Sequence, residues 1–158
     1  MLRKSSLNAK LYLKKAIHNL DFTNWIYDRH KDEIPSTFGN ERFFDWVIVG
    51  YYYSIYHATL ALIATRDLLS KSHLATLNAL IVHFYHEVKR LDKGDIELVA
   101  ESIGKTLERE DIEIVVYAKS LRERASYNAS YEFEESLVKT AKENAVRFIE
   151  KAKAILEG

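Results

Sequence analysis

Apolar residues recur at intervals of three and four along most of this chain, a pattern that predicts amphipathic α-helices. The first predicted helix runs from about Ser6 to Arg29. Its apolar positions are Ala9, Leu13, Ala16, Ile17 and Leu20. Pro35 and Gly39 then stand close together, so we expect residues 34–40 to form a loop.

The segment from about Glu41 to Leu69 is apolar nearly all round and is predicted to be the central helix, with Asn40 as its cap. Such a helix needs neighbours on several sides, so it belongs in the middle of a bundle or in a subunit interface. Ser54, His57 and several tyrosines interrupt its longest apolar stretch. This composition predicts a buried helix and not a membrane span.

A third helix is predicted from its cap, Ser72, to about Leu91. Gly94 is expected to end this helix, and Asp95 to cap the next one. The apolar stripe of the third helix is Leu74, Leu77, Leu80, Ile81, Phe84 and Val88.

The chain is expected to stay helical from Asp95 to about Tyr127, with an interruption near Gly104 and the charged run 108–111. A turn over 127–131 follows, in which Ser130 is the predicted cap of the last helix. These segments make five or six helices, and we predict an all-α, antiparallel up-and-down bundle.

Composition supports one all-α domain over residues 1–158. One proline and five glycines leave few places where a helix must break. Hydrophobic residues make up 47% and charged residues 29%, which is typical of a folded domain rather than a disordered chain. The chain has no cysteine, which excludes disulfides, and its start lacks the apolar region of a signal peptide. We therefore expect a cytoplasmic protein with no membrane partner.

The formal net charge is zero, which argues against a strongly electrostatic nucleic-acid binder. The charge is nevertheless uneven, because residues 1–20 hold five basic residues and no acidic one. Residues 87–113, in contrast, hold nine acidic and five basic residues. Such blocks are more often solvated helix faces than binding surfaces, but a basic helix could also pair with a partner or a second copy.

Neither a cofactor nor a metal is expected. Gly50 and Gly104 are isolated, so the chain has no glycine-rich loop that would cradle a phosphate. His83 and Glu87 share one helical face, with His86 about a turn from His83, but this pair could hold a metal only with a third ligand from another helix. We therefore interpret them as partly exposed polar residues.

The tyrosine-rich run 51–58 has two interpretations. It could form an aromatic platform for a nucleic-acid base, in which Tyr53 and His57 share one face and Tyr52 and Tyr56 another. Alternatively it is a core segment whose tyrosine hydroxyls and His57 satisfy one another, and this interpretation is the better supported.

The segment 119–131 carries the strongest candidate site. Arginine suits phosphate and aromatic faces suit bases. The candidate contacts are Lys119, Arg122, Arg124, Tyr127 and Tyr131. Arg122 and Tyr127 are five residues apart, so they converge only if the helix ends there or a second subunit closes the space. The alternative is a surface arginine pair bridged to Glu123 and nearby acids.

Three landmarks, taken in order, resemble HEPN domains (higher eukaryotes and prokaryotes nucleotide-binding), in particular their small stand-alone prokaryotic branch. They are the run Tyr-Tyr-Tyr-Ser-Ile-Tyr-His-Ala at 51–58, the turn Lys71-Ser72-His73, and the segment 121–127 before a long final helix. The resemblance covers about Arg42 to Leu156. It implies an up-and-down bundle that forms a homodimer.

Many HEPN proteins are metal-independent ribonucleases or toxins, in which an arginine is followed several residues later by a histidine. In this chain Arg122 matches the arginine, and Tyr127 stands where the histidine would be. A tyrosine has an unperturbed pKa near 10, so it transfers protons poorly at neutral pH. Ser126 also stands where the branch commonly has an acidic residue. These departures from the family motif therefore affect a binding function less than a catalytic one.

We accordingly expect a dimeric HEPN-like protein that binds RNA, a nucleotide or a nucleotidyltransferase partner, as in toxin–antitoxin pairs. Arg122 would be the main phosphate contact and Tyr127 the stacking or hydrogen-bonding group. One alternative is a metal-independent ribonuclease that uses Arg122 with Tyr127 as its catalytic pair, or with His57 or His73 brought from elsewhere. Another is a purely structural or regulatory subunit that docks a nucleotidyltransferase.

Overall fold

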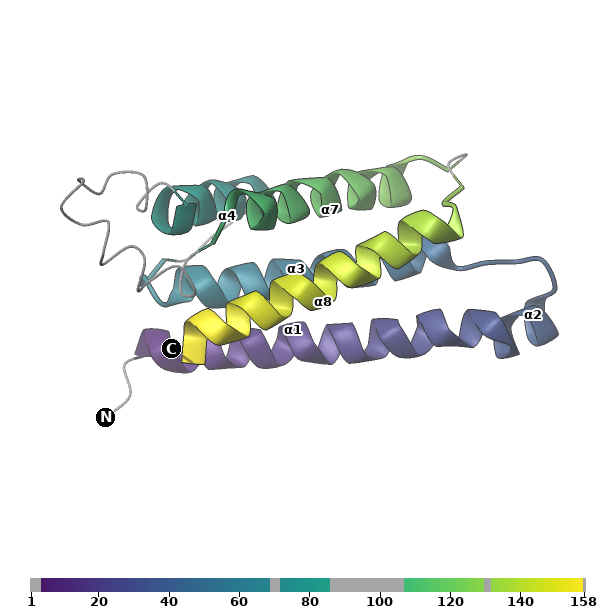
Figure 1. Ribbon diagram of the computed structural model, residues 1–158, viewed down its shortest axis with the longest axis horizontal. Helices are drawn as coiled ribbons and strands as arrows, with labels where there is room; N and C mark the ends of the chain where they lie inside the picture. The colour runs from purple at the N-terminus through teal and green to yellow at the C-terminus, as the bar shows by residue number, and fades with distance from the viewer. Residues whose placement is uncertain (1–3, 69–71, 86–106, 130–131, 158) are drawn as a thin grey trace.

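The computed structural model describes residues 4–68, 72–85, 107–129 and 132–157, and every regular element in these ranges is helical. Four long helices lie side by side along the molecule (Figure 1). They are α1 (Lys4–Asp28), α3 (Phe44–Ala64), α7 (Arg109–Tyr127) and α8 (Glu135–Glu157). The shorter α4 (His73–Leu80) lies beside α3. The predicted all-α class is confirmed.

The central element is α3, which packs against α1, α4, α7 and α8. Within the described residues it is the one helix that is long and apolar enough to cross a membrane. However, 67% of its most apolar window is buried inside the protein. The prediction of a buried central helix is therefore confirmed. Its largest fully buried side chains are Val47, Ile48, Tyr51, Ile55, Thr59, Leu62 and Ile63.

The connection between α1 and α3 differs from the predicted loop. A 3₁₀ turn, η1 (Arg29–Lys31), leads into a short helix, α2 (Glu33–Phe38). Pro35 is tolerated because it lies in the first turn, where a backbone N–H has no partner within the helix. Gly39 ends α2 with a φ of 67°, a conformation that favours glycine.

The predicted start of the central helix was also wrong. Its first residue is Phe44, so Asn40 is not the cap, and Phe43 in the cap position makes no side-chain cap bond. His30 supplies a tertiary link at this point instead. Its Nε2 accepts the backbone N–H of Phe43 at 3.0 Å, while its Nδ1 lies 3.0 Å from the carbonyl oxygen of Ile26.

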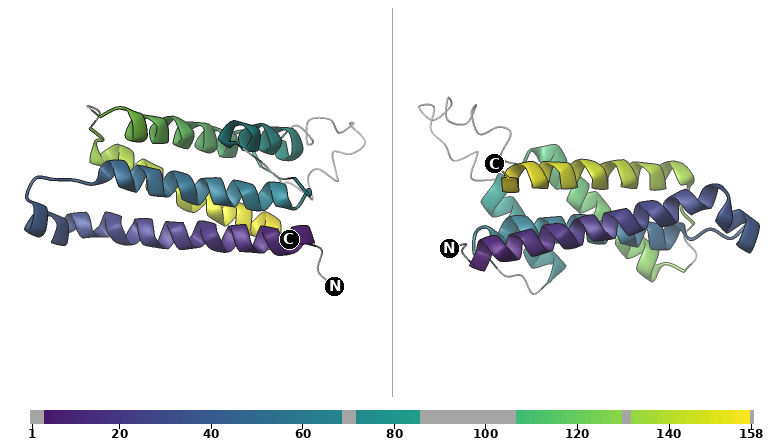
Figure 2. Two further views of the ribbon diagram at one scale, coloured as in Figure 1. Left: turned by 180° about the vertical axis from the view of Figure 1, so that it is seen from behind. Right: turned by 90° about the horizontal axis from the view of Figure 1, so that it is seen from below.

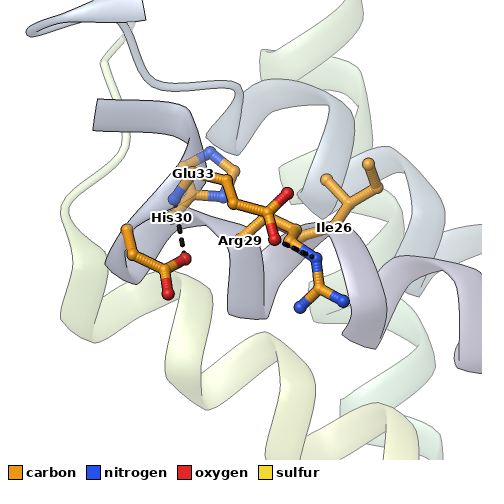
Figure 3. Close-up of polar contacts among 5 residues, drawn as sticks. Ile26, Arg29, His30 and Glu33 are labelled. Atoms are coloured by element: carbon orange, nitrogen blue, oxygen red, sulfur yellow. Dashed lines mark hydrogen bonds and ion pairs between the residues drawn. The ribbon is translucent and has the colours of Figure 1, made fainter. Parts of the chain in front are cut away.

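His30 is buried, and its ring stacks on Phe44 with 4.8 Å between ring centroids. Figure 3 shows it at the end of α1, beside the ion pair in which Arg29 Nε lies 3.3 Å from Glu33 Oε1. Nδ1 must carry the proton in this arrangement, because Nε2 is already an acceptor. His30 thus joins the end of α1 to the start of α3.

The end of the central helix also differs, since α3 ends at Ala64 and not near Leu69, whereas the start of the third helix agrees with the sequence. Ser72 caps α4, since its side chain accepts the backbone N–H of Ala75 at 3.1 Å. The helix continues as a π-helical turn, η2 (Ile81–Tyr85). The predicted end near Leu91, the turn at Gly94 and the cap at Asp95 lie outside the described residues.

The charged run 108–111 marks a helix boundary, as predicted. Glu108 and Asp111 form a reciprocal capping box that starts α7, in which each carboxylate accepts a backbone N–H of the other residue. Gly104 and Ser130 lie outside the described residues. The last helix, α8, begins at Glu135, five positions after the predicted cap position.

The helices α1 and α3 approach closely at Gly50. A Cβ atom at this position would overlap the Oγ1 and Cγ2 atoms of Thr23. Thr23 is itself buried and donates to the carbonyl oxygen of Asn19 at 2.6 Å, which holds its side chain in place. The absence of a side chain at Gly50 therefore sets the distance between these two helices.

We predict that Gly50→Ala lowers the free energy of unfolding, measured by urea denaturation. Overpacking costs about 1–3 kcal/mol, which exceeds the gain of about 1 kcal/mol from replacing a helical glycine. Thr23→Ala removes the two overlapping atoms, so Gly50→Ala should cost less, or even stabilise, in the Thr23→Ala background. Equal costs in both backgrounds would show that the contact with Thr23 is not responsible.

Candidate functional site

The guanidinium of Arg122 lies where α7 crosses the tyrosine-rich face of α3. Its Nη2 donates a long hydrogen bond, 3.4 Å, to the hydroxyl of Tyr53. Its Cζ lies 5.7 Å from the ring centroid of Tyr52 and 5.9 Å from that of Tyr53. These distances are typical of cation–π contacts, so α3 holds the cation on its aromatic rings.

Tyr127 is the third tyrosine near the guanidinium. Its ring centroid lies 5.8 Å from Cζ of Arg122, and its side chain is 76% exposed. Both residues lie in the last two turns of α7, which ends at Tyr127 before Asn128 leaves the helical conformation. This is one of the two conditions that the sequence required, and it is met within a single copy of the chain.

Arg122 keeps its charge without a carboxylate partner. No carboxylate in the described part of the chain forms an ion pair with it, and its Nε is buried there without a hydrogen bond. Burial acts to lower the pKa of Arg122, but the hydrogen bond with Tyr53 and the nearby tyrosines outweigh it, so the pKa is raised. The site therefore presents a half-buried, permanently positive group.

A histidine joins the same cluster from α4. The hydroxyl of Tyr52 and Nδ1 of His73 form a hydrogen bond, and the His73 ring lies 4.3 Å from that of Tyr56. When Tyr52 donates to Nδ1, the proton of the neutral imidazole resides on Nε2. His73 follows the cap residue Ser72, so the start of α4 positions it.

The cluster opposes charge on His73. Burial lowers the pKa of His73, and the positive charges of Arg122 and Lys119 lower it further. Burial raises the pKa of the Tyr52 hydroxyl, although Arg122 acts in the opposite direction. At neutral pH the site therefore combines a neutral histidine, a neutral tyrosine and a charged arginine.

The second histidine candidate has a different environment. Nδ1 of His57 lies 2.8 Å from the carbonyl oxygen of Tyr53 and 3.3 Å from Nδ2 of Asn19. Its ring contacts Tyr53 and Tyr56, and of its two polar contacts one is within α3 and the other, with Asn19, reaches α1. His57 thus links α3 to α1, and His73 is the histidine that the fold brings to Arg122.

The other basic candidates lie around the same end of α7. Lys119 forms an ion pair with Glu123, with 2.6 Å between Nζ and Oε1, so part of its charge is already compensated. Arg124 and Arg122 line one open, shallow depression. Its lining residues are Ser120, Arg122, Glu123, Arg124, Tyr127 and Asn128. Tyr131 lies outside the described residues.

The tyrosine run itself agrees in part with the predicted core interpretation. Tyr51 and Tyr52 are buried, and the Tyr51 hydroxyl donates to Oδ1 of Asn24 at 2.8 Å. Tyr53 is only partly buried and points its hydroxyl at Arg122. The run therefore contributes both to the core and to the site.

The sequence did not identify Tyr52 and Tyr53 as partners of His73 and Arg122. Tyr53 and Arg122 are 69 positions apart, and no periodicity connects residues on different helices. Nor does any group of three or more His, Cys, Asp or Glu suited to a metal occur among the described residues. His86 and Glu87 of the considered metal set lie outside those residues.

A comparison with known proteins finds no family model and no curated protein that match this chain.

We predict that His73 makes stability depend on pH just below its ordinary value of 6.5. Its pKa is lower in the folded chain than in the unfolded chain, so the unfolded state binds more protons in this range. The contribution of His73 to the free energy of unfolding should be complete above about pH 6.5 and should fall as the pH is lowered.

Urea denaturation at a series of pH values checks this prediction. His73→Gln should flatten the pH dependence in that range, whereas the same change at the exposed His18 serves as the matched control. If wild type and His73→Gln showed parallel pH profiles, the proposed cost of charging His73 would be absent.

Proposed function

We propose that this chain binds a phosphate-bearing ligand, RNA or a nucleotide, at Arg122. The observation that carries the proposal is the guanidinium held between Tyr52, Tyr53 and Tyr127 without a carboxylate partner in the described chain. A guanidinium fork suits phosphate oxygens, and an exposed ring such as that of Tyr127 suits a base. Arg124 borders the same depression and would assist with the backbone charge.

The wider proposal is an HEPN-like, antiparallel up-and-down bundle that acts as a cytoplasmic homodimer in a toxin–antitoxin context. Its support is the all-helical architecture together with the order of the tyrosine run, the Ser72–His73 turn and the Arg122–Tyr127 segment. A minimal nucleotidyltransferase is the protein partner that this resemblance suggests. Co-purification with the product of an adjacent reading frame would test that part.

We predict that Arg122→Ala weakens binding of a fluorescein-labelled single-stranded RNA oligonucleotide, measured by anisotropy at fixed salt. Loss of a charged hydrogen-bond pair of about 1.5–3 kcal/mol corresponds to roughly a tenfold to hundredfold rise in Kd. Tyr127→Ala should also weaken binding, because it removes a stacking surface worth about 1–3 kcal/mol.

Arg109→Ala provides the matched control for this experiment. Arg109 lies at the opposite end of α7, is largely exposed and pairs with Glu113 at 3.1 Å. If Arg109→Ala and Arg122→Ala weakened binding equally, the affinity would reflect general charge and not this site. ATP as a competitor distinguishes a mononucleotide ligand from a longer RNA.

The position of His73 favours a second candidate function, a metal-independent ribonuclease. The histidine missing at position 127 is replaced in space by one from α4 that shares Tyr52 and Tyr53 with Arg122. In this function Nδ1 of neutral His73, released from the Tyr52 hydroxyl, would take the proton of a ribose 2′-hydroxyl, whose oxygen attacks phosphorus and displaces the 5′-oxygen, which leaves as an alcohol with a proton from water. Arg122 would stabilise the charge that develops on the phosphate.

We predict for this second function that RNA is cleaved in excess EDTA and that His73→Ala and Arg122→Ala each abolish cleavage. His57→Ala is the control, since the polar contacts of His57 are with Asn19 and the backbone of α3, not with Arg122. Intact RNA at high protein concentration, combined with binding that depends on Arg122, would leave a binding protein and rule out the nuclease.

A further inference from the structure

The outer face of α1 carries large apolar side chains that the rest of the described chain leaves exposed. Leu7 is 50%, Leu11 56%, Phe22 61% and Trp25 50% exposed. The helix lies at one edge of the bundle and is uncovered in the view from below (Figure 2, right). A run of exposed leucines and aromatic residues along one helix is unusual for a surface that faces only water.

These residues form a continuous seam. The exposed positions Leu7, Leu11, Lys14, His18, Phe22 and Trp25 follow one another at intervals of three and four. This is the spacing with which one helix packs along another. The inner face of α1 uses other residues, Ala9, Ala16 and Thr23, which are buried within the bundle. The seam is therefore additional to the packing of the bundle.

The charges beside the seam indicate what covers it. On one flank, Lys10 stands in the N-terminal half of α1 and Asp21 in the C-terminal half, both exposed. Lys14 and His18 occupy the middle of the seam. A second α1 in antiparallel orientation would bring Lys10 opposite Asp21 on the same flank, whereas in a parallel pair this flank would face the other flank of the second copy, so Lys10 and Asp21 would not meet.

We propose that the outer face of α1 is a self-association surface that binds α1 of a second copy of this chain in antiparallel orientation. The two-fold axis crosses this outer face at the level of position 16. In this register Leu7 packs against Trp25 of the second copy, and Leu11 packs against Phe22. Lys10 pairs with Asp21 of the second copy. Because the axis repeats every contact, the interface holds two ion pairs and four leucine–aromatic contacts.

The antiparallel register follows from the positions alone. Residues that face each other across an axis near position 16 have numbers that sum to about 31 to 33. The apolar ends of the seam, leucines at one end and aromatics at the other, then cover each other. Lys14 faces His18 of the second copy at the centre of the seam, so the two Lys14 side chains do not face each other.

This surface is distinct from the candidate site. The Arg122 cluster is formed by α3, α4 and α7, whereas the seam belongs to α1 alone. The proposal therefore does not depend on phosphate binding. It predicts a dimer whose formation is unaffected by Arg122→Ala.

Charge reversal tests the register, with sedimentation velocity over a range of micromolar concentrations as the readout. Lys10→Asp and Asp21→Lys should each raise the dimer Kd about tenfold or more, because each places like charges opposite one another twice. The double variant Lys10→Asp/Asp21→Lys should restore dimerisation, since the two charges exchange places. Failure of the double variant to recover would overturn the antiparallel register.

A second comparison tests the apolar seam. Leu11→Glu should give a monomer at concentrations where the wild type is a dimer. Val116→Glu is the matched control, because Val116 is 47% exposed on α7, and it should leave the dimer intact. Circular dichroism confirms that each variant is folded, so a monomer is not mistaken for an unfolded chain.

Two results would overturn the proposal. The first is a wild-type chain that stays monomeric throughout the micromolar range. The second is a dimer that Leu11→Glu does not disturb. A monomer that sediments with phosphatidylglycerol vesicles but not with phosphatidylcholine vesicles would assign the leucines, aromatics and lysines of α1 to an anionic lipid surface.

Discussion

The packing of α3 is the constraint on which the rest of the structure depends. A helix with apolar residues on most of its circumference is stable in water only when neighbouring helices cover it. The helices α1, α4, α7 and α8 provide this cover. Gly50 lets α1 approach most closely, and His30 fixes the chain reversal that brings α1 back alongside α3. The arrangement of the bundle thus follows from the need to bury one helix.

The candidate site lies where the neighbouring helices cover α3 only in part. Tyrosine suits positions of α3 between the core and the solvent, because each side chain combines an apolar ring with a polar hydroxyl. Tyr51 faces the interior, whereas Tyr53 meets Arg122 at the edge. The aromatic rings keep the guanidinium in place without neutralising it. A structural requirement and the proposed phosphate binding therefore share the same residues.

Local features of the fold were predictable from the sequence, because they depend on residues within one or two turns of each other. Helical periodicity, the Ser72 cap and the end of α7 at Tyr127 are of this kind. The segment around Pro35 was misjudged as a loop because proline is tolerated in the first turn of a helix. The predicted Asn40 cap failed because α3 begins four residues later, where His30 binds the backbone.

The sequence by itself thus determined that the chain is helical, that one helix is buried, and that Arg122 and Tyr127 lie at a helix end. Only the tertiary structure decided which residues join them. Tyr53 and His73 reach Arg122 because α3, α4 and α7 meet, and His57 turns toward α1 instead. The physical reason is the separation along the sequence over which each effect acts. Periodicity and capping depend on residues a few positions apart, whereas the pairing of helix faces depends on the burial of the whole core.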